Sequence, residues 1–122
     1  MTPFFVAVSG KGGTGKTTVS ALLVQSLVDA GVRPVLAVDA DPNANLHEAL
    51  GVVVRESLGE MREEAFQKSI PPGMSRTDYI RYRFHRALVE SKGFDLLAMG
   101  RPEGEGCYCF ANDLLKTCMR LL

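Results

Sequence analysis

A glycine-rich segment near the N-terminus contains the residue types that bind phosphate. Residues 10–18 read GKGGTGKTT and fit the spacing G-x-x-x-x-G-K-[ST]. Glycines let backbone N–H groups curl around an anion because no Cβ stands in the way. Lys16 is placed to reach the β- and γ-phosphates of a nucleotide, and the Thr17 hydroxyl can join the shell of a Mg²⁺ ion. The predicted nucleotide-binding residues are Gly10, Lys11, Gly12, Gly13, Thr14, Gly15, Lys16, Thr17 and Thr18.

Two carboxylates follow an apolar run further along the chain. Asp39 and Asp41 stand two residues apart, directly before Pro42. Residues i and i+2 of an extended chain face the same side, and α/β proteins bind ligands at the carboxyl ends of their parallel strands. One carboxylate can therefore hold a Mg²⁺-bound water while the other orients an attacking water. A polar strand end with a proline stop is the alternative interpretation.

The three cysteines fall into two groups. Cys107 and Cys109 follow a glycine-rich stretch, and two thiolates at this spacing can bind one soft metal ion such as Zn²⁺ or Ni²⁺. One chain offers two such ligands, whereas a two-fold dimer would supply the four of a tetrahedral site. Two unrelated or buried thiols remain the alternative. Cys118 lies on an apolar helical stripe and is expected to be an inert buried thiol.

Strands and helices must position these residues, and the hydrophobic pattern predicts both. Runs that are apolar on both faces indicate central parallel strands, and apolar residues at helical spacing indicate amphipathic helices. Strands are expected at Phe4–Val8, Pro34–Asp39 and Phe94–Met99. Helices are expected from Thr17 to Ala30, from Asn45 to Leu50, after Ser57, from Thr77 to Ser91, and through Leu115 to Leu122. The order strand, glycine loop, helix, strand predicts parallel pairing with a right-handed crossover in an α/β fold. A glycine-rich turn without a ligand is disfavoured by these flanking elements.

Composition excludes several classes of function. The 122 residues carry 14 Lys+Arg and 14 Asp+Glu, so the net charge is zero and gives no general attraction to nucleic acid or to an anionic membrane. No apolar run reaches the roughly 18 residues of a spanning helix, and three cysteines argue against a disulfide scaffold. We therefore expect a cytoplasmic protein without a nucleic-acid or membrane partner. The basic residues of 76–92 are interpreted as a solvated helix face, with a nucleic-acid or partner surface as the alternative, and His47 and His85 are interpreted as structural or exposed.

The glycine-rich segment also resembles a specific class. A lysine directly after the first glycine, here Lys11, resembles the deviant Walker A motif of the MinD, ParA and nitrogenase iron protein class of P-loop ATPases. The resemblance implies that Lys11 reaches across a homodimer to the phosphates bound by the partner chain, as an arginine finger does. It further implies that Asp41 orients the attacking water and that Asp39 lies in the second shell of Mg²⁺. Lys11, Lys16 and Asp41 are then the expected catalytic residues.

Three segments together resemble a narrower family. The deviant Walker A motif, the sequence VDADP at 38–42 and the sequence GRPEGEGCYC at 100–109 are similar to those of the CooC/AcsF-type ATPases. This family matures carbon monoxide dehydrogenase and acetyl-CoA synthase by helping to insert nickel. The resemblance implies Mg-ATP as cofactor, ATP-driven homodimerisation, and Ni²⁺ or Zn²⁺ held by Cys107 and Cys109 of both chains. The partner would be the apo-enzyme of either client.

One departure from the family concerns the end of the chain. The predicted strand at 94–99 ends in Gly-Arg-Pro rather than in an acidic residue, and the base-recognition region has no counterpart. The final amphipathic stretch stops without a glycine, a proline or a polar tail. We expect residues 1–122 to be the N-terminal portion of a single P-loop ATPase domain, with a small complete domain as the alternative.

Three other functions remain open from the sequence. A partitioning or positioning ATPase of the ParA/MinD type would need a DNA or membrane surface and would have no use for the C-x-C pair. An ATP-driven electron donor like the nitrogenase iron protein would hold an Fe–S cluster with its interface cysteines. A fragment could also bind nucleotide or metal without turnover.

Overall fold

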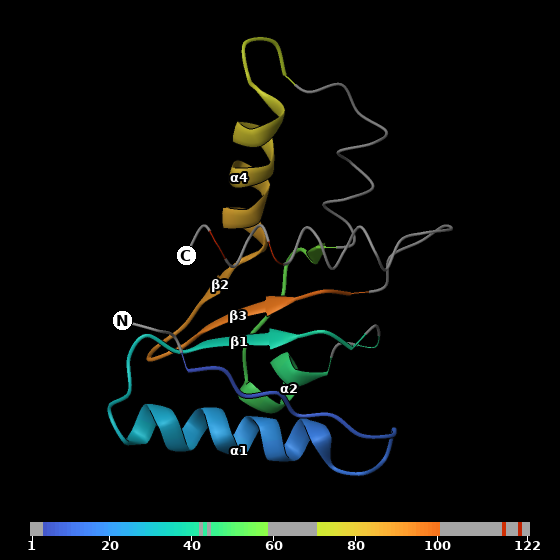
Figure 1. Ribbon diagram of the computed structural model, residues 1–122, viewed down its shortest axis with the longest axis vertical. Helices are drawn as coiled ribbons and strands as arrows, with labels where there is room; N and C mark the ends of the chain where they lie inside the picture. Colours follow the sequence, from blue (N-terminus) through green and yellow to red (C-terminus); the bar gives the residue numbers. More distant parts are fainter. Residues whose placement is uncertain are drawn as a thin grey trace.

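The computed structural model describes residues 4–41, 43, 45–58, 71–100, 116 and 120. Two helices and a strand form the N-terminal half, and a helix and a hairpin form the second described stretch (Figure 1). The elements are α1 (Lys16–Asp29), β1 (Leu36–Asp39), α2 (Leu46–Leu50), α4 (Arg76–Ala87), β2 (Val89–Glu90) and β3 (Asp95–Ala98).

The described strands form one mixed sheet in the order β1-β3-β2. β1 and β3 are parallel and run in register from Leu36 opposite Asp95 to Asp39 opposite Ala98. β2 pairs antiparallel with β3 through a tight turn at Gly93, whose φ is 90°. A Cβ at Gly93 would lie 2.6 Å from a methyl group of Val28 in α1, so only glycine fits there. The predicted strands at 34–39 and 94–99 are confirmed, together with their α/β context.

The helices cover the two faces of the sheet. In Figure 1, α1 and α2 lie below the strands, and α4 projects above them. Residues on the lower side form a core cluster of Val24, Ala37, Leu46, Phe94 and Leu96. Successive side chains of a strand point to opposite faces, and Leu96 and Leu97 of β3 are both fully buried. β3 is therefore covered on both faces, as the apolar residues at 96–99 predict.

The predicted strand at Phe4–Val8 is wrong. The structure has no strand there, and Phe4 and Phe5 are 93% and 73% exposed. The hydrophobic pattern indicates that a segment can be buried in a sheet, but it does not identify the strand with which that segment pairs. Here β2 occupies the edge of β3 that faces away from β1, through Val89 opposite Leu96 and Glu90 opposite Asp95. A hairpin closes a short loop, so this local pairing costs less chain entropy than pairing with a distant segment.

Helix boundaries follow recognisable end signals. α2 ends at the predicted Leu50, and its C-cap Gly51 takes up a left-handed conformation with φ 72°, which favours glycine. The Ser75 hydroxyl accepts a hydrogen bond from the backbone N–H of Asp78 and so begins α4. α4 ends at Ala87, four residues before the predicted Ser91, because the chain becomes extended at Leu88 and enters β2. The helices predicted after Ser57 and through 115–122 lie almost entirely outside the described residues.

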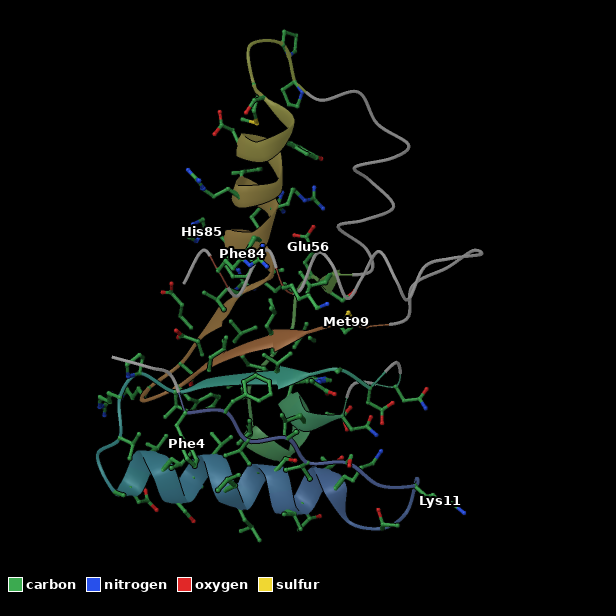
Figure 2. The ribbon with its side chains drawn as sticks, viewed as in Figure 1. Phe4, Lys11, Glu56, Phe84, His85 and Met99 are labelled. Atoms are coloured by element: carbon green, nitrogen blue, oxygen red, sulfur yellow. The ribbon has the colours of Figure 1, made fainter. Side chains whose placement is uncertain are left out.

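Glu56 and Arg83 form a buried ion pair beside α4. The Arg83 guanidinium donates to one Glu56 oxygen, and Arg86 Nε lies 3.7 Å from the other. Glu56 is labelled in Figure 2, next to Phe84 of α4. Burial, and secondarily the charge of Arg86, lowers the pKa of Arg83. The interpretation of the basic residues of 76–92 as a solvated face is therefore wrong for Arg83, because its counter-ion stands 27 residues earlier in the chain. Within the described part, no helix has the length and apolar character to cross a membrane.

Candidate nucleotide-binding site

A pocket of about 450 Å³ opens where the glycine-rich segment, the first turn of α1 and the carboxyl end of β1 meet. The lining includes Ser9, Gly10, Lys16, Thr17, Asp39 and Asp41, which are the residues that could contact a phosphate or a metal ion. Two segments that are more than 20 positions apart in the sequence thus contribute to one cavity. The arrangement agrees with the rule that α/β ligand sites form outside the carboxyl ends of strands.

The glycine-rich segment bends in a way that demands glycine at particular positions. Gly13 and Gly15 have φ values of 81° and 89°, in the left-handed region that residues with a Cβ avoid. A Cβ at Gly10 would lie 3.0 Å from the Thr14 hydroxyl oxygen, whereas one at Gly12 would meet nothing within 4 Å. The Thr14 hydroxyl and N–H both donate to the Lys11 carbonyl, at 2.6 and 3.3 Å, and so close the turn.

The start of α1 offers hydrogen-bond donors to an anion. Gly15 is the N-cap of this 14-residue helix, and no side chain caps the N–H groups of its first turn. No acidic residue stands in that turn. Uncapped N–H groups and the positive end of the helix dipole together favour a negative group such as phosphate.

Lys16 faces Asp41 across the pocket. Lys16 Nζ lies 3.8 Å from Asp41 Oδ2, and the two side chains are 30% and 45% exposed. The other oxygen, Asp41 Oδ1, accepts a hydrogen bond of 2.9 Å from the backbone N–H of Asn43. The lysine and the carboxylate that the sequence singles out are therefore neighbours, although 25 positions separate them.

Asp39 is buried and forms hydrogen bonds with residues of three segments. Its Oδ1 accepts from the backbone N–H of Asp41, and its Oδ2 accepts from the N–H of Leu46 at the start of α2, both at 3.1 Å. Its carbonyl oxygen accepts from the N–H of Met99 at 2.8 Å. Each carboxylate oxygen can accept a second hydrogen bond, so a role near Mg²⁺ stays a prediction. The geometry shows directly that Asp39 shapes the pocket wall.

The remaining predicted residues do not line the pocket. Lys11 is exposed and points away from the strands at the tip of the glycine-rich segment (Figure 2). Gly12, Gly13, Thr14, Gly15 and Thr18 shape the segment or the helix start without lining the cavity. Cys107 and Cys109 lie outside the described residues, and the described ones include no group of three His, Cys, Asp or Glu that could hold a metal.

The sequence reasoning did not name six of the lining residues as site residues, which are Val8, Ser9, Ser20, Val38, Ala40 and Leu46. Ser20 lies one helical turn after Lys16, so the spacing i and i+4 could have placed it on the same face of α1. Leu46 reaches the pocket because its N–H donates a hydrogen bond to the Asp39 carboxylate, and no local sequence pattern predicts such a contact.

Comparison with known proteins agrees with this pocket. Residues 5–120 match the CobQ/CobB/MinD/ParA nucleotide-binding domain. An uncharacterised ATP-binding protein of Methanocaldococcus jannaschii is 49% identical over 91% of the chain and 45% of its own length. The carbon monoxide dehydrogenase accessory protein CooC of Rhodospirillum rubrum is 35% identical over 94% of the chain and 48% of its own length.

A third relative is named as a ParA family protein. A virulence plasmid ParA family protein of Chlamydia psittaci is 35% identical over 68% of the chain and 28% of its own length. The chain spans about half the length of the first two relatives. The match covers nearly every residue and includes both segments that build the pocket, and the chain thus belongs to the CobQ/CobB/MinD/ParA nucleotide-binding domain family.

Proposed function

We propose that the protein is a Mg²⁺-dependent ATPase. The observation that carries this proposal is the meeting of Lys16, Thr17 and Asp41 in one pocket beside the uncapped start of α1. A relative that is named for ATP binding supports ATP as the nucleotide. Phosphoryl transfer needs little more than positioning and charge neutralisation, and these residues can supply both.

Each residue has one task in the proposed reaction. Lys16 and the first-turn N–H groups of α1 bind the phosphates and offset their negative charge. Asp41 accepts a hydrogen bond from a water molecule and orients it. The water oxygen then bonds to the γ-phosphorus as the bond to the bridging oxygen of ADP breaks, and the proton leaves with inorganic phosphate.

The donor set of the pocket suits Mg²⁺. Thr17 offers a hydroxyl, and Asp39 and Asp41 offer carboxylates, which are the hard oxygen groups this ion prefers. We propose that Thr17 would bind the ion directly and that Asp39 would act through a bound water. When bound, Mg²⁺ would neutralise charge on the β- and γ-phosphates.

We further propose that ATP drives homodimerisation, with Lys11 acting on the nucleotide of the partner chain. The support is that Lys11 is exposed at the tip of its segment and lies outside the pocket of its own chain. A cation delivered from a second chain can raise the rate of phosphoryl transfer as an arginine finger does.

The cellular role we propose is nickel insertion into carbon monoxide dehydrogenase or acetyl-CoA synthase. The likeness to a carbon monoxide dehydrogenase accessory protein supports it, together with the Cys107–Cys109 pair, whose thiolates suit Ni²⁺ or Zn²⁺ cargo. The second candidate is a ParA-type partitioning ATPase, which the similarity to a plasmid ParA family protein favours.

Replacement of Asp41 by Ala tests the hydrolytic part. We expect the full-length variant to bind Mg-ATP, to lose turnover and to accumulate as a dimer in size-exclusion chromatography with light scattering. The matched control is Asp29→Ala, which removes a carboxylate at the far end of α1 and should keep turnover. Parental turnover in Asp41→Ala would contradict the assigned role.

Metal analysis separates the two cellular candidates. We expect one Ni²⁺ or Zn²⁺ per dimer, lost in the Cys107→Ala/Cys109→Ala variant and kept in Cys118→Ala. Thiolate ligation requires deprotonated sulfur, so metal affinity should fall as the pH decreases. One metal per monomer, or retention by the double variant, would exclude the shared site.

A further inference from the structure

The lysine that should bind phosphate has an anionic neighbour in the pocket. Lys16 Nζ lies 3.8 Å from Asp41 Oδ2 at the edge where the pocket opens to solvent. Lys16 stands directly after the N-cap of α1, so its ammonium adds to the positive field of the helix start. The Asp41 carboxylate thus lies beside the cation that we expect to bind phosphate.

Two backbone contacts hold Asp41 in this position. Its N–H donates to the buried Asp39 carboxylate, and its Oδ1 accepts from the N–H of Asn43. Both bonds join residues two positions apart, which is the geometry of an Asx turn. With the main chain fixed by Asp39 and one oxygen bound by Asn43, the second oxygen remains directed at Lys16.

We propose that Asp41 acts as an internal substitute for phosphate, which pairs with Lys16 while the pocket is empty and yields it when a nucleotide binds. This inference rests on the proposed function, and it adds that nucleotide binding must displace a carboxylate. A phosphate and a carboxylate that both lie next to one ammonium group repel each other, so the two anions compete for Lys16. The exchange frees the Asp41 oxygen at the moment when a γ-phosphate arrives, and it favours ADP release after hydrolysis.

Affinity for ADP measures this competition without turnover. In full-length protein with EDTA present, so that Mg²⁺ plays no part, we expect Asp41→Asn to bind a fluorescent ADP analogue roughly two- to fivefold more tightly, the range of a partly exposed ion pair. Asp29→Asn is the matched control, because its carboxylate lies about 20 Å from Lys16 along α1. The control should bind like the parent. Unchanged affinity in Asp41→Asn would overturn the proposal.

A double-mutant cycle separates the pair from general repulsion between Asp41 and phosphate. In a Lys16→Gln background no ammonium is held by Asp41, so the gain from Asp41→Asn should be smaller. An equal or larger gain in that background would mean that Asp41 merely repels the nucleotide, and the proposal would fail.

Some variants could bind ADP too weakly for the affinity to be measured. For these, urea unfolding without nucleotide measures the coupling between Lys16 and Asp41 directly. The two single variants, the double variant and the parent should show a coupling of roughly two- to fivefold in the unfolding equilibrium constant. Absence of coupling would overturn the pairing. A parent that binds neither ADP nor ATP would refute the proposed function, whereas the unfolding cycle would still test the Lys16–Asp41 pair.

Discussion

At the carboxyl end of β1, the buried Asp39 side chain accepts hydrogen bonds from Asp41 and Leu46, and its carbonyl accepts one from Met99. The glycine-rich segment that faces it is exposed from Gly10 to Gly15, and its turn is closed by Thr14 on the Lys11 carbonyl. One side of the pocket is thus part of the core, and the other is shaped by backbone conformation. We infer that packing holds Asp39 in place, whereas the glycine-rich segment depends on its own backbone turn for its shape.

Replacement of Asp39 by Ala should produce the largest effect on stability. It removes an ionised acceptor from two backbone N–H groups, one of them buried, so we expect the free energy of unfolding to fall by about 3 kcal/mol. Asp29→Ala, which removes an exposed carboxylate on α1, should change it by less than about 0.5 kcal/mol. Urea titration of both variants measures the difference. Equal losses would show that the end of β1 is no better fixed than the surface.

Replacement of Gly15 by Ala should have an intermediate effect. Alanine at a φ of 89° is strained, so we expect a loss of about 1 kcal/mol in unfolding free energy and weaker nucleotide binding. Gly12→Ala is the matched control in the same segment, because a Cβ there meets nothing within 4 Å. If both alanines behaved alike, the left-handed turn at Gly15 would not be what shapes the segment.

Replacement of Lys11 by Ala should have the smallest effect on the folded chain. Lys11 is exposed, so we expect the unfolding free energy to change by less than about 0.5 kcal/mol and nucleotide affinity to stay the same. Turnover should disappear, because the proposed action of Lys11 is on the partner chain. Lys92→Ala, at another exposed lysine, should keep turnover. ATP hydrolysis at the parental rate in Lys11→Ala would contradict that action.

Local patterns named residues that meet in one pocket, but they did not predict the whole sheet. The motif around Lys16 and the strand end at Asp39 depend on residues that are close in sequence, and the structure brings both to one pocket. The run at Phe4–Val8 is apolar throughout, but an apolar pattern does not say whether a segment pairs with a neighbouring strand, and no described strand pairs with it. β2 has two residues, which is too short for any periodicity to appear.

Charge counting failed for a similar reason. Arg83 and Arg86 belong to one basic stretch of sequence, but Arg83 is buried against Glu56 and Arg86 is exposed. Helical spacing could have placed Arg83 on the same face as the buried Tyr79 and Ala87, four residues before and after it. The position of Glu56 depends on tertiary packing, so composition alone assigned every basic side chain to solvent.

The most direct test of the central claim is the affinity of full-length Lys16→Ala for ADP, measured beside the parent and Lys11→Ala. The account predicts a loss of roughly tenfold to a hundredfold for Lys16→Ala, because a charge-assisted contact to phosphate is removed, and no loss for Lys11→Ala. Equal affinity in Lys16→Ala and the parent would contradict it, since the phosphates would then bind outside the pocket that α1 and β1 form.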